Sequence, residues 1–173
     1  PAARNYQQGV RLTEHASVKA RGLRAGQWSA LVEAHFIIQR DFTDLMISEI
    51  MYHPSNEEGV DGDTFEFIEL KNVSNQTMQL GGVHFTAGID YTFEEGAELA
   101  PGAFAVLVHD APSFASRYPG VPVAGVYEGR LNNGGEAIAL VHASGTPLTH
   151  VRFGDEEPWP VLADGGGFSL VPR

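Results

Sequence analysis

The chain has 173 residues, of which 43% are hydrophobic and 19% charged, and its net charge at pH 7 is −11. This hydrophobic content suffices for the core of a full domain, and no apolar run is long enough to predict a transmembrane segment. The absence of cysteine excludes disulfides, thiolate metal sites and cysteine nucleophiles.

The charges are divided unevenly along the chain. Residues 1–41 contain six Lys or Arg against three acidic residues, whereas residues 42–173 contain five against nineteen. We place a boundary at this change of sign, with part of a small β-module at 1–41 and the main domain at 42–173. A main domain this acidic repels a polyanion, so we expect no nucleic-acid partner. Calcium or a basic surface fits the charge better.

The first part reads as a β-hairpin. The stretch "ASVKARGL" (16–23) alternates polar and apolar residues, and "ALVEAHFII" (30–38) is a second apolar run after a turn at Ala25-Gly26. Two strands are marginal on their own in water. We therefore expect this hairpin to be the end of a truncated β-module or to pack on another surface.

The second part predicts an all-β domain. Short apolar runs follow one another between Gly- and Pro-containing turns, a rhythm typical of an antiparallel β-sandwich of seven to nine strands. The residues Asn132-Asn133-Gly134-Gly135 predict a hairpin turn between two of these runs. The stretch "DAPSFASRYPG" (110–120) predicts one short helix, capped by Asp110, at one end of the sandwich.

Several stretches of the second part resemble the lamin tail domain in its bacterial form. They are "LMISEIMYHP", "EFIELKNVSNQTMQLGGVHFTAGIDYTF", "LAPGAFAVLVHD", "YEGRLNNGGEAIALV" and "EEPWPVLADGGGFSLVPR". The resemblance covers about residues 45–173 and implies an immunoglobulin-like β-sandwich, in agreement with the strand pattern. Many lamin tail domains have Trp in the short motif after the Leu-Gly turn, where this chain has Val83.

The hairpin stretch "SVKARGLRAGQWSALVEAHFII" (17–38) is similar to the end of the small fibronectin-like module that follows chitobiase-type glycoside hydrolases. The two resemblances together imply a large exported bacterial protein in which such modules are neighbours. They imply an extracellular or cell-surface interaction or scaffolding module that binds a protein or a cell-surface polymer. Because the chain begins at Pro1 rather than Met, we expect it to be a piece of that longer protein.

The sequence contains no recognised catalytic pattern. Seven His are present, but there is no His-Glu-x-x-His, Gly-x-Ser-x-Gly or P-loop motif, and "ADGGGFSL" (163–170) leads into a strand rather than a helix. We therefore expect no enzymatic activity and no cofactor. The alternative to a scaffolding module is a carbohydrate-binding accessory module of a hydrolase, which coplanar exposed aromatic residues would favour. The Tyr and Trp residues are scattered along the sequence.

The stretch "DTFEFIELKN" (63–72) places acids within an apolar run. Alternation along a strand puts Glu66 on the face of Ile68 and Leu70, and Glu69 on the opposite face. A buried carboxylate needs a partner, because its desolvation is otherwise too costly.

A similar acid, Glu49, alternates onto the face of Leu45, Ile47 and Met51. We expect Glu49 and Glu69 to serve the fold by accepting hydrogen bonds from the backbone or from a cation, such as Lys71 or Arg152.

The loop "PSNEEGVDGDT" (54–64) is the candidate metal site. Glu57, Asp61 and Asp63, together with Glu58, offer the oxygen ligands that calcium prefers, although their spacing is not that of an EF-hand. A solvated acidic turn is the alternative, and it is the more common outcome for such a loop.

Overall fold

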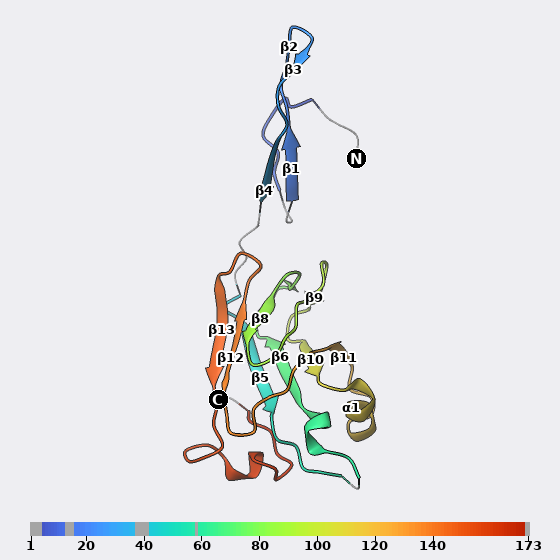
Figure 1. The fold of residues 1–173 in the computed structure, drawn as a ribbon, viewed down its shortest axis with the longest axis vertical. Helices are drawn as coiled ribbons and strands as arrows, with labels where there is room; N and C mark the ends of the chain where they lie inside the picture. Colours follow the sequence, from blue (N-terminus) through green and yellow to red (C-terminus); the bar gives the residue numbers. More distant parts are fainter. Residues whose placement is uncertain (1–4, 13–15, 37–41, 58, 172–173) are drawn as a thin grey trace. The chain divides into compact units, whose positions relative to one another are not determined.

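The computed structural model describes residues 5–12, 16–36, 42–57 and 59–171 (Figure 1). The chain divides into two compact units, Pro1–Arg40 and Asp41–Arg173. The end of the second hairpin run, at 37–38, and residues 40–41 at the predicted boundary lie outside the described residues. No helix in the described ranges is both long enough and apolar enough to cross a membrane.

The first unit contains the predicted hairpin. Strand β1 (Ala16–Ala20) pairs antiparallel with β4 (Val32–Phe36), and β2 (Leu23–Arg24) pairs with β3 (Gln27–Trp28). Ala25 and Gly26 join β2 to β3 with φ angles of 49° and 80°, the positive values that a tight hairpin turn requires. The hairpin is therefore confirmed, and none of its described residues is buried.

The second unit is an immunoglobulin-like β-sandwich, as predicted. One sheet has the order β11-β10-β6-β5 and contains β5 (Leu45–Met51), β6 (Phe67–Asn72), β10 (Phe104–Val108) and β11 (Val123–Val126). The other has the order β13-β12-β8 and contains β8 (His84–Ala87), β12 (Ala137–Val141) and β13 (Pro147–Arg152). A short ribbon pairs β7 (Met78–Gln79) with β9 (Glu98–Leu99).

A single hydrophobic core joins the two sheets. Ile68 and Leu107 of the four-stranded sheet belong to the same buried cluster as Phe85, Ile138 and Leu140 of the three-stranded sheet. Burying one such side chain contributes about 1.5–3 kcal/mol relative to leaving it in water. Packing between the sheets is therefore the main source of stability of this unit.

Strand β11 departs from the expected antiparallel pattern, because it pairs parallel with β10. Parallel neighbours need a crossover connection, and the predicted helix provides it as α1 (Ala111–Arg117). The Asp110 side chain caps α1 by accepting a hydrogen bond of 2.8 Å from the backbone N–H of Ser113. Phe114 packs on outward-facing Phe67 and Val108, so α1 covers the outer face of the four-stranded sheet rather than an end of the sandwich.

The turn at Asn132–Gly135 does not form the predicted hairpin. The run before it leads from β11 of one sheet, and the run after it is β12 of the other sheet. Gly135 has the expected positive φ of 89°, and its N–H donates to the carbonyl oxygen of Asn132. The turn therefore carries the chain between the sheets, a role that turn residues alone do not reveal.

Two of the expected strands are reduced to isolated pairs. The run 90–93 pairs only at His84–Thr92 and Asp90–Glu128, and Leu170 of the last run exchanges two backbone hydrogen bonds with Ile50 of β5. Two short 3₁₀ helices complete the unit, η1 (Gly62–Phe65) and η2 (Val161–Ala163).

We expect Gly135→Ala to destabilise the sandwich more than Gly129→Ala. Both glycines have φ near 90°, so both alanines carry the backbone cost of about 1–2 kcal/mol. A Cβ at Gly135 would also lie 2.5 Å from Gly154 Cα, whereas a Cβ at Gly129 meets no atom within 4 Å. Overpacking adds about 1–3 kcal/mol. Urea denaturation measures the free energies of unfolding, and equal losses would contradict this packing at the sheet crossover.

Candidate functional site

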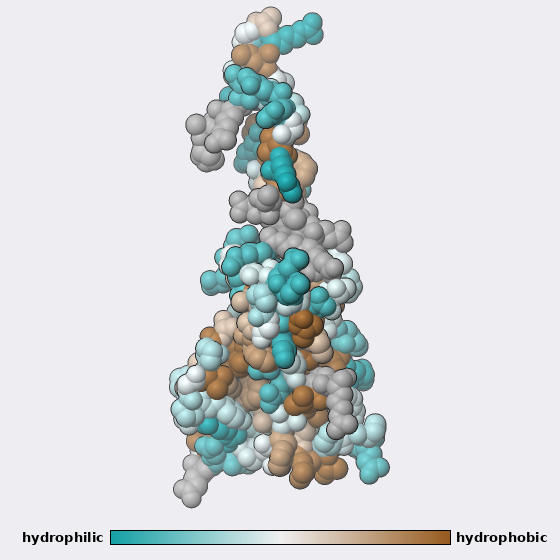
Figure 2. Space-filling view, turned by 180° about the vertical axis from the view of Figure 1, so that it is seen from behind, coloured by the Kyte–Doolittle hydropathy of each residue, from teal (hydrophilic) through white to brown (hydrophobic). Residues whose placement is uncertain are grey.

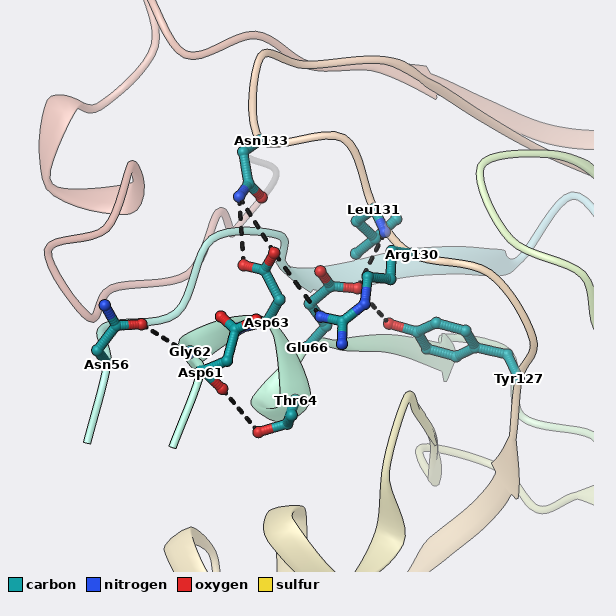
Figure 3. Close-up of polar contacts among 10 residues, drawn as sticks. All are labelled: Asn56, Asp61, Gly62, Asp63, Thr64, Glu66, Tyr127, Arg130, Leu131 and Asn133. Carbon is teal, nitrogen blue, oxygen red and sulfur yellow. Dashed lines mark hydrogen bonds and ion pairs between the residues drawn. The ribbon is translucent and has the colours of Figure 1, made fainter. Parts of the chain in front are cut away.

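Asp61, Asp63 and Glu66 lie near the segment that carries the chain from one sheet to the other (Figure 3). Glu66 follows η1 at the start of β6, and Asp63 lies within η1. Tyr127, Arg130 and Asn133 come from the crossover segment between β11 and β12. Residues about 60 positions apart in sequence therefore form one polar cluster, which we call the Glu66 cluster.

Glu66 is the central member and is 0% exposed. Its Oε2 accepts hydrogen bonds from the backbone N–H of Leu131 at 2.9 Å and from the Tyr127 hydroxyl at 3.2 Å. Its backbone carbonyl accepts a third from the N–H of His109, at 3.1 Å. Its Oε1 is buried and has no hydrogen-bond partner among the described residues. One carboxylate thus holds the crossover segment against β6.

Burial raises the pKa of Glu66 to about 7, and the nearby Asp63 carboxylate acts in the same direction. The hydrogen bonds from Leu131 and Tyr127, and the charge of Arg130, lower this pKa and offset part of the effect. Burial also raises the pKa of the Tyr127 hydroxyl, which therefore stays protonated as a donor.

Asp63 and its neighbours tie the loop to the same segment. The Asp63 carboxylate accepts hydrogen bonds from the Asn133 amide at 3.2 and 3.4 Å and lies 3.7 Å from Arg130 Nη1. The Asp61 side chain accepts from the N–H of Asp63 and caps η1. Asn56 Oδ1 accepts from the N–H of Gly62 at 2.7 Å. The loop is thus held by its own side chains.

Glu57, the third predicted calcium ligand, points to a different partner. The Nε of Arg117 donates to Glu57 Oε1 at 2.7 Å, and the same guanidinium lies 3.5 Å from the centre of the Phe65 ring. The described residues contain no group of three acidic, His or Cys side chains that could hold a metal ion. Glu58 lies outside the described residues. Calcium binding through Glu57, Asp61 and Asp63 remains a prediction, and it would require rearrangement of these internal partners.

Glu49 and Glu69 are held as expected, but by partners that the sequence did not indicate. Ser48 Oγ donates to Glu69 Oε1 at 2.7 Å, and Ser169 Oγ donates to Glu49 Oε1. Neither acid has an ion pair with Lys71 or Arg152 among the described contacts.

The predicted face of Glu49 is wrong. The pairing of β5 with β6 shifts register between Ile47 and Glu49, which is a β-bulge. Leu45, Ile47 and Ile50 all belong to the core, so the alternation changes phase at the bulge. Glu49 therefore leaves the face of Leu45 and Ile47 and lies opposite Glu69.

The Glu66 cluster is suited to holding the fold rather than to catalysis. A general acid or base must reach a substrate within hydrogen-bond distance, and Glu66 is closed off from solvent. The exposed acids Glu57 and Asp61 have no nucleophile and base arranged beside them among the described contacts. The carboxylates of Glu57, Asp63 and Glu66 instead accept hydrogen bonds or ion pairs that join separate parts of the chain, and that of Asp61 caps η1.

The fold and these structural acids define a class of protein, the immunoglobulin-like β-sandwich module without catalytic machinery. The family model of the Lamin Tail Domain matches residues 39–155, which is more than half of the chain. The chain belongs to the lamin tail domain family, and the lamin tail domain is a non-catalytic module. None of the curated proteins matches the chain.

The match spans both sheets, α1 and the Glu66 cluster, and the predicted family is confirmed. It ends at residue 155, so η2 and the last pairing at Leu170 lie beyond it. The match does not extend over β1–β4, and the resemblance of this hairpin to a chitobiase-associated module is not supported by it.

We expect Glu66→Gln to change how stability depends on pH. Folded Glu66 keeps its proton up to about pH 7, whereas the unfolded residue releases it near 4.5. The folded state therefore binds more protons in this window, and the wild-type free energy of unfolding falls as pH rises. This difference in pKa corresponds to a loss on the order of 3 kcal/mol in the free energy of unfolding as the pH rises. The variant has no ionisable group at this position and does not show this loss.

Urea denaturation at pH 4.5 and 7.5 measures this difference between wild type and variant. Glu69→Gln is the control, because it removes an acid from the same strand outside the core. A difference between wild type and Glu66→Gln that does not change with pH would contradict the assignment.

We expect calcium and magnesium to raise the unfolding temperature equally at equal ionic strength. Glu57 and Asp63 are already paired with arginines, so added cations act on the acidic domain chiefly through screening. Thermal unfolding with each ion tests this. A larger calcium shift that is lost in the Asp61→Ala, Asp63→Ala double variant would instead establish the predicted calcium site.

Proposed function

We propose that this chain is an interaction or scaffolding module of a larger exported bacterial protein and that it binds a protein or a cell-surface polymer. The observation that carries the proposal is that the acids within the strand sequences stabilise the fold. Glu49, Glu66 and Glu69 all accept hydrogen bonds that hold the fold together. Other molecules would therefore bind to the surface of the sandwich rather than to these acids.

The surface charge supports a partner that is not a polyanion. Residues 42–173 contain nineteen acidic residues against five Lys or Arg. On the face of the molecule in Figure 2, apolar residues lie in separate groups among hydrophilic ones. This mixture is typical of surfaces that bind partners weakly or through a limited patch.

The hairpin supports a multidomain setting. Leu23, Trp28 and Val32 are each more than half exposed. Exposed apolar side chains on a two-stranded ribbon gain stability when another surface covers them. The remainder of the chitobiase-type fibronectin-like module, of which the hairpin would be the end, is our proposal for that surface.

A carbohydrate-binding module is the less favoured alternative. Tyr52 and Tyr127 are buried, and Trp159 is only half-exposed and contacts Gly154. Trp28 is exposed, but the guanidinium of Arg21 lies 4.3 Å from its ring centre. The described part of the sandwich therefore presents no flat Tyr or Trp platform of the kind that stacks on sugar rings.

We expect the chain to bind selected peptides and to leave insoluble polysaccharides unbound. A peptide array probed with the labelled chain tests the first part, and sedimentation with chitin and cellulose tests the second. Trp28→Ala is the control for sugar stacking. Retention on a polysaccharide that Trp28→Ala abolishes, together with a blank peptide array, would overturn the choice of a protein partner in favour of the alternative.

A further inference from the structure

A groove lies beside the outer edge of strand β11. Its volume is about 660 Å³, and its walls are the segment Thr92–Glu98 and the strand residues Ala124–Val126. Figure 1 shows β9 and β11, which border this region, within the sandwich unit. We call this feature the edge groove.

One wall of the edge groove is an unpaired strand edge. β11 is the last strand of its sheet, and Tyr127 donates its backbone N–H to Val108 of β10 at 3.0 Å. Backbone groups alternate in direction along a strand, so Val126, between Gly125 and Tyr127, faces outward, as Glu128 does. The pairing of β11 with β10 shifts register at Ala124, so the alternation is regular only from Gly125 onward.

The opposite wall begins to pair with this edge and then leaves it. Asp90 and Glu128 exchange two backbone hydrogen bonds of 3.0 Å, and the next antiparallel pair would be Thr92 with Val126. Tyr91 and Phe93 instead bond to the backbone on the β8 side. Thr92 therefore turns its backbone away from β8, and the two edges separate around the groove.

Tyr91 holds the two walls in place. Its hydroxyl donates to the carbonyl oxygen of Ala124 at 3.4 Å, and a Cβ at Gly125 would lie 2.2 Å from that hydroxyl oxygen. Its ring packs edge-on against Phe93 at 5.0 Å between centroids. Because Gly125 leaves room for Tyr91, the edge groove is preformed.

The lining carries negative charge only. Glu94, Glu95 and Glu98 contribute to it, and it contains no Lys, Arg or His. Glu98 accepts a hydrogen bond from Gln79, whereas Glu94 and Glu95 are exposed and have no cationic partner among the described contacts. Charge complementarity therefore selects a cationic occupant.

We propose that an extended peptide segment bearing Lys or Arg adds to β11 in the edge groove. Its backbone would pair with the outward groups of Val126, and its cationic side chains would lie beside Glu94 and Glu95. Main-chain pairing at a sheet edge supplies affinity, and side-chain contacts supply specificity. This inference rests on the proposed function, since it names the surface and the partner of an interaction module.

The test is an NMR titration of the ¹⁵N-labelled chain with an eight-residue Val-Lys repeat and, separately, with any sequence selected by the array. We expect shift changes in the backbone amides of Thr92–Glu98 and Ala124–Val126. A Val-Lys peptide with N-methyl groups on alternate residues should lose binding at least tenfold, because it cannot pair with a strand edge. A Val-Glu repeat should not bind.

Two matched variants separate this groove from general attraction to an acidic domain. We expect Glu94→Gln with Glu95→Gln to weaken the Val-Lys repeat about fivefold at low salt, since two exposed ion pairs are lost. Glu156→Gln with Glu157→Gln removes the same charge from another pair of adjacent exposed glutamates and should leave affinity unchanged. Val126→Pro removes the outward donor without removing a bond to β10 and should abolish binding.

Several results would overturn the inference. Equal losses in the two glutamate pairs, or shift changes away from β11, would show binding elsewhere and would leave the interaction module itself intact. A dimer of the chain that Val126→Pro dissociates would show that a second copy occupies the edge. No binding by the Val-Lys repeat and no array hit would reject both the groove and a peptide partner.

Discussion

The pairing of the Glu66 carboxylate with the Leu131 N–H and the Tyr127 hydroxyl sets the arrangement of the sandwich unit. A carboxylate at this depth is costly unless it is hydrogen-bonded, and these two donors come from the segment that crosses between the sheets. The crossover therefore cannot move without exposing the carboxylate or leaving it unpaired. Through this contact, one buried carboxyl group at the start of β6 fixes where the chain enters the second sheet.

The neighbouring acids extend the same principle to the surface. Asp63 holds Asn133 and Arg130, and Glu57 holds Arg117 of the helix that covers the outer sheet face. A strongly acidic domain thus uses several charges for internal connections, whereas Glu94 and Glu95, without a cation among the described contacts, lie beside the open sheet edge. This division explains how one sequence can carry many carboxylates and still lack a described metal or catalytic cluster.

The sequence was sufficient for the all-β class, the N-terminal hairpin and the helix, because these depend on local periodicity, turn residues and capping. The family followed from the resemblance of several stretches to lamin tail domains. The sequence was insufficient where contacts between residues far apart in the chain determine the structure. Alternation did place Glu66 beside Ile68 and Leu70, but only the fold reveals that Tyr127 and Leu131 satisfy it. The bulge beside Ser48 changed the face of Glu49, and a one-residue insertion leaves no periodic signal. The parallel pairing of β11 likewise depends on the path of the crossover rather than on the strand itself.

That parallel crossover has a consequence for the order of folding. β6 pairs with a strand on each side, whereas β11 is an edge strand that can join β10 only after the intervening helix has been placed. Closing such a connection costs chain entropy before any ladder contact compensates for it. We therefore expect β11 to dock late in folding and to detach early when the native state opens locally. A segment bound along the free edge of β11 would delay that opening. A partner of this module would therefore stabilise its folded state against local unfolding.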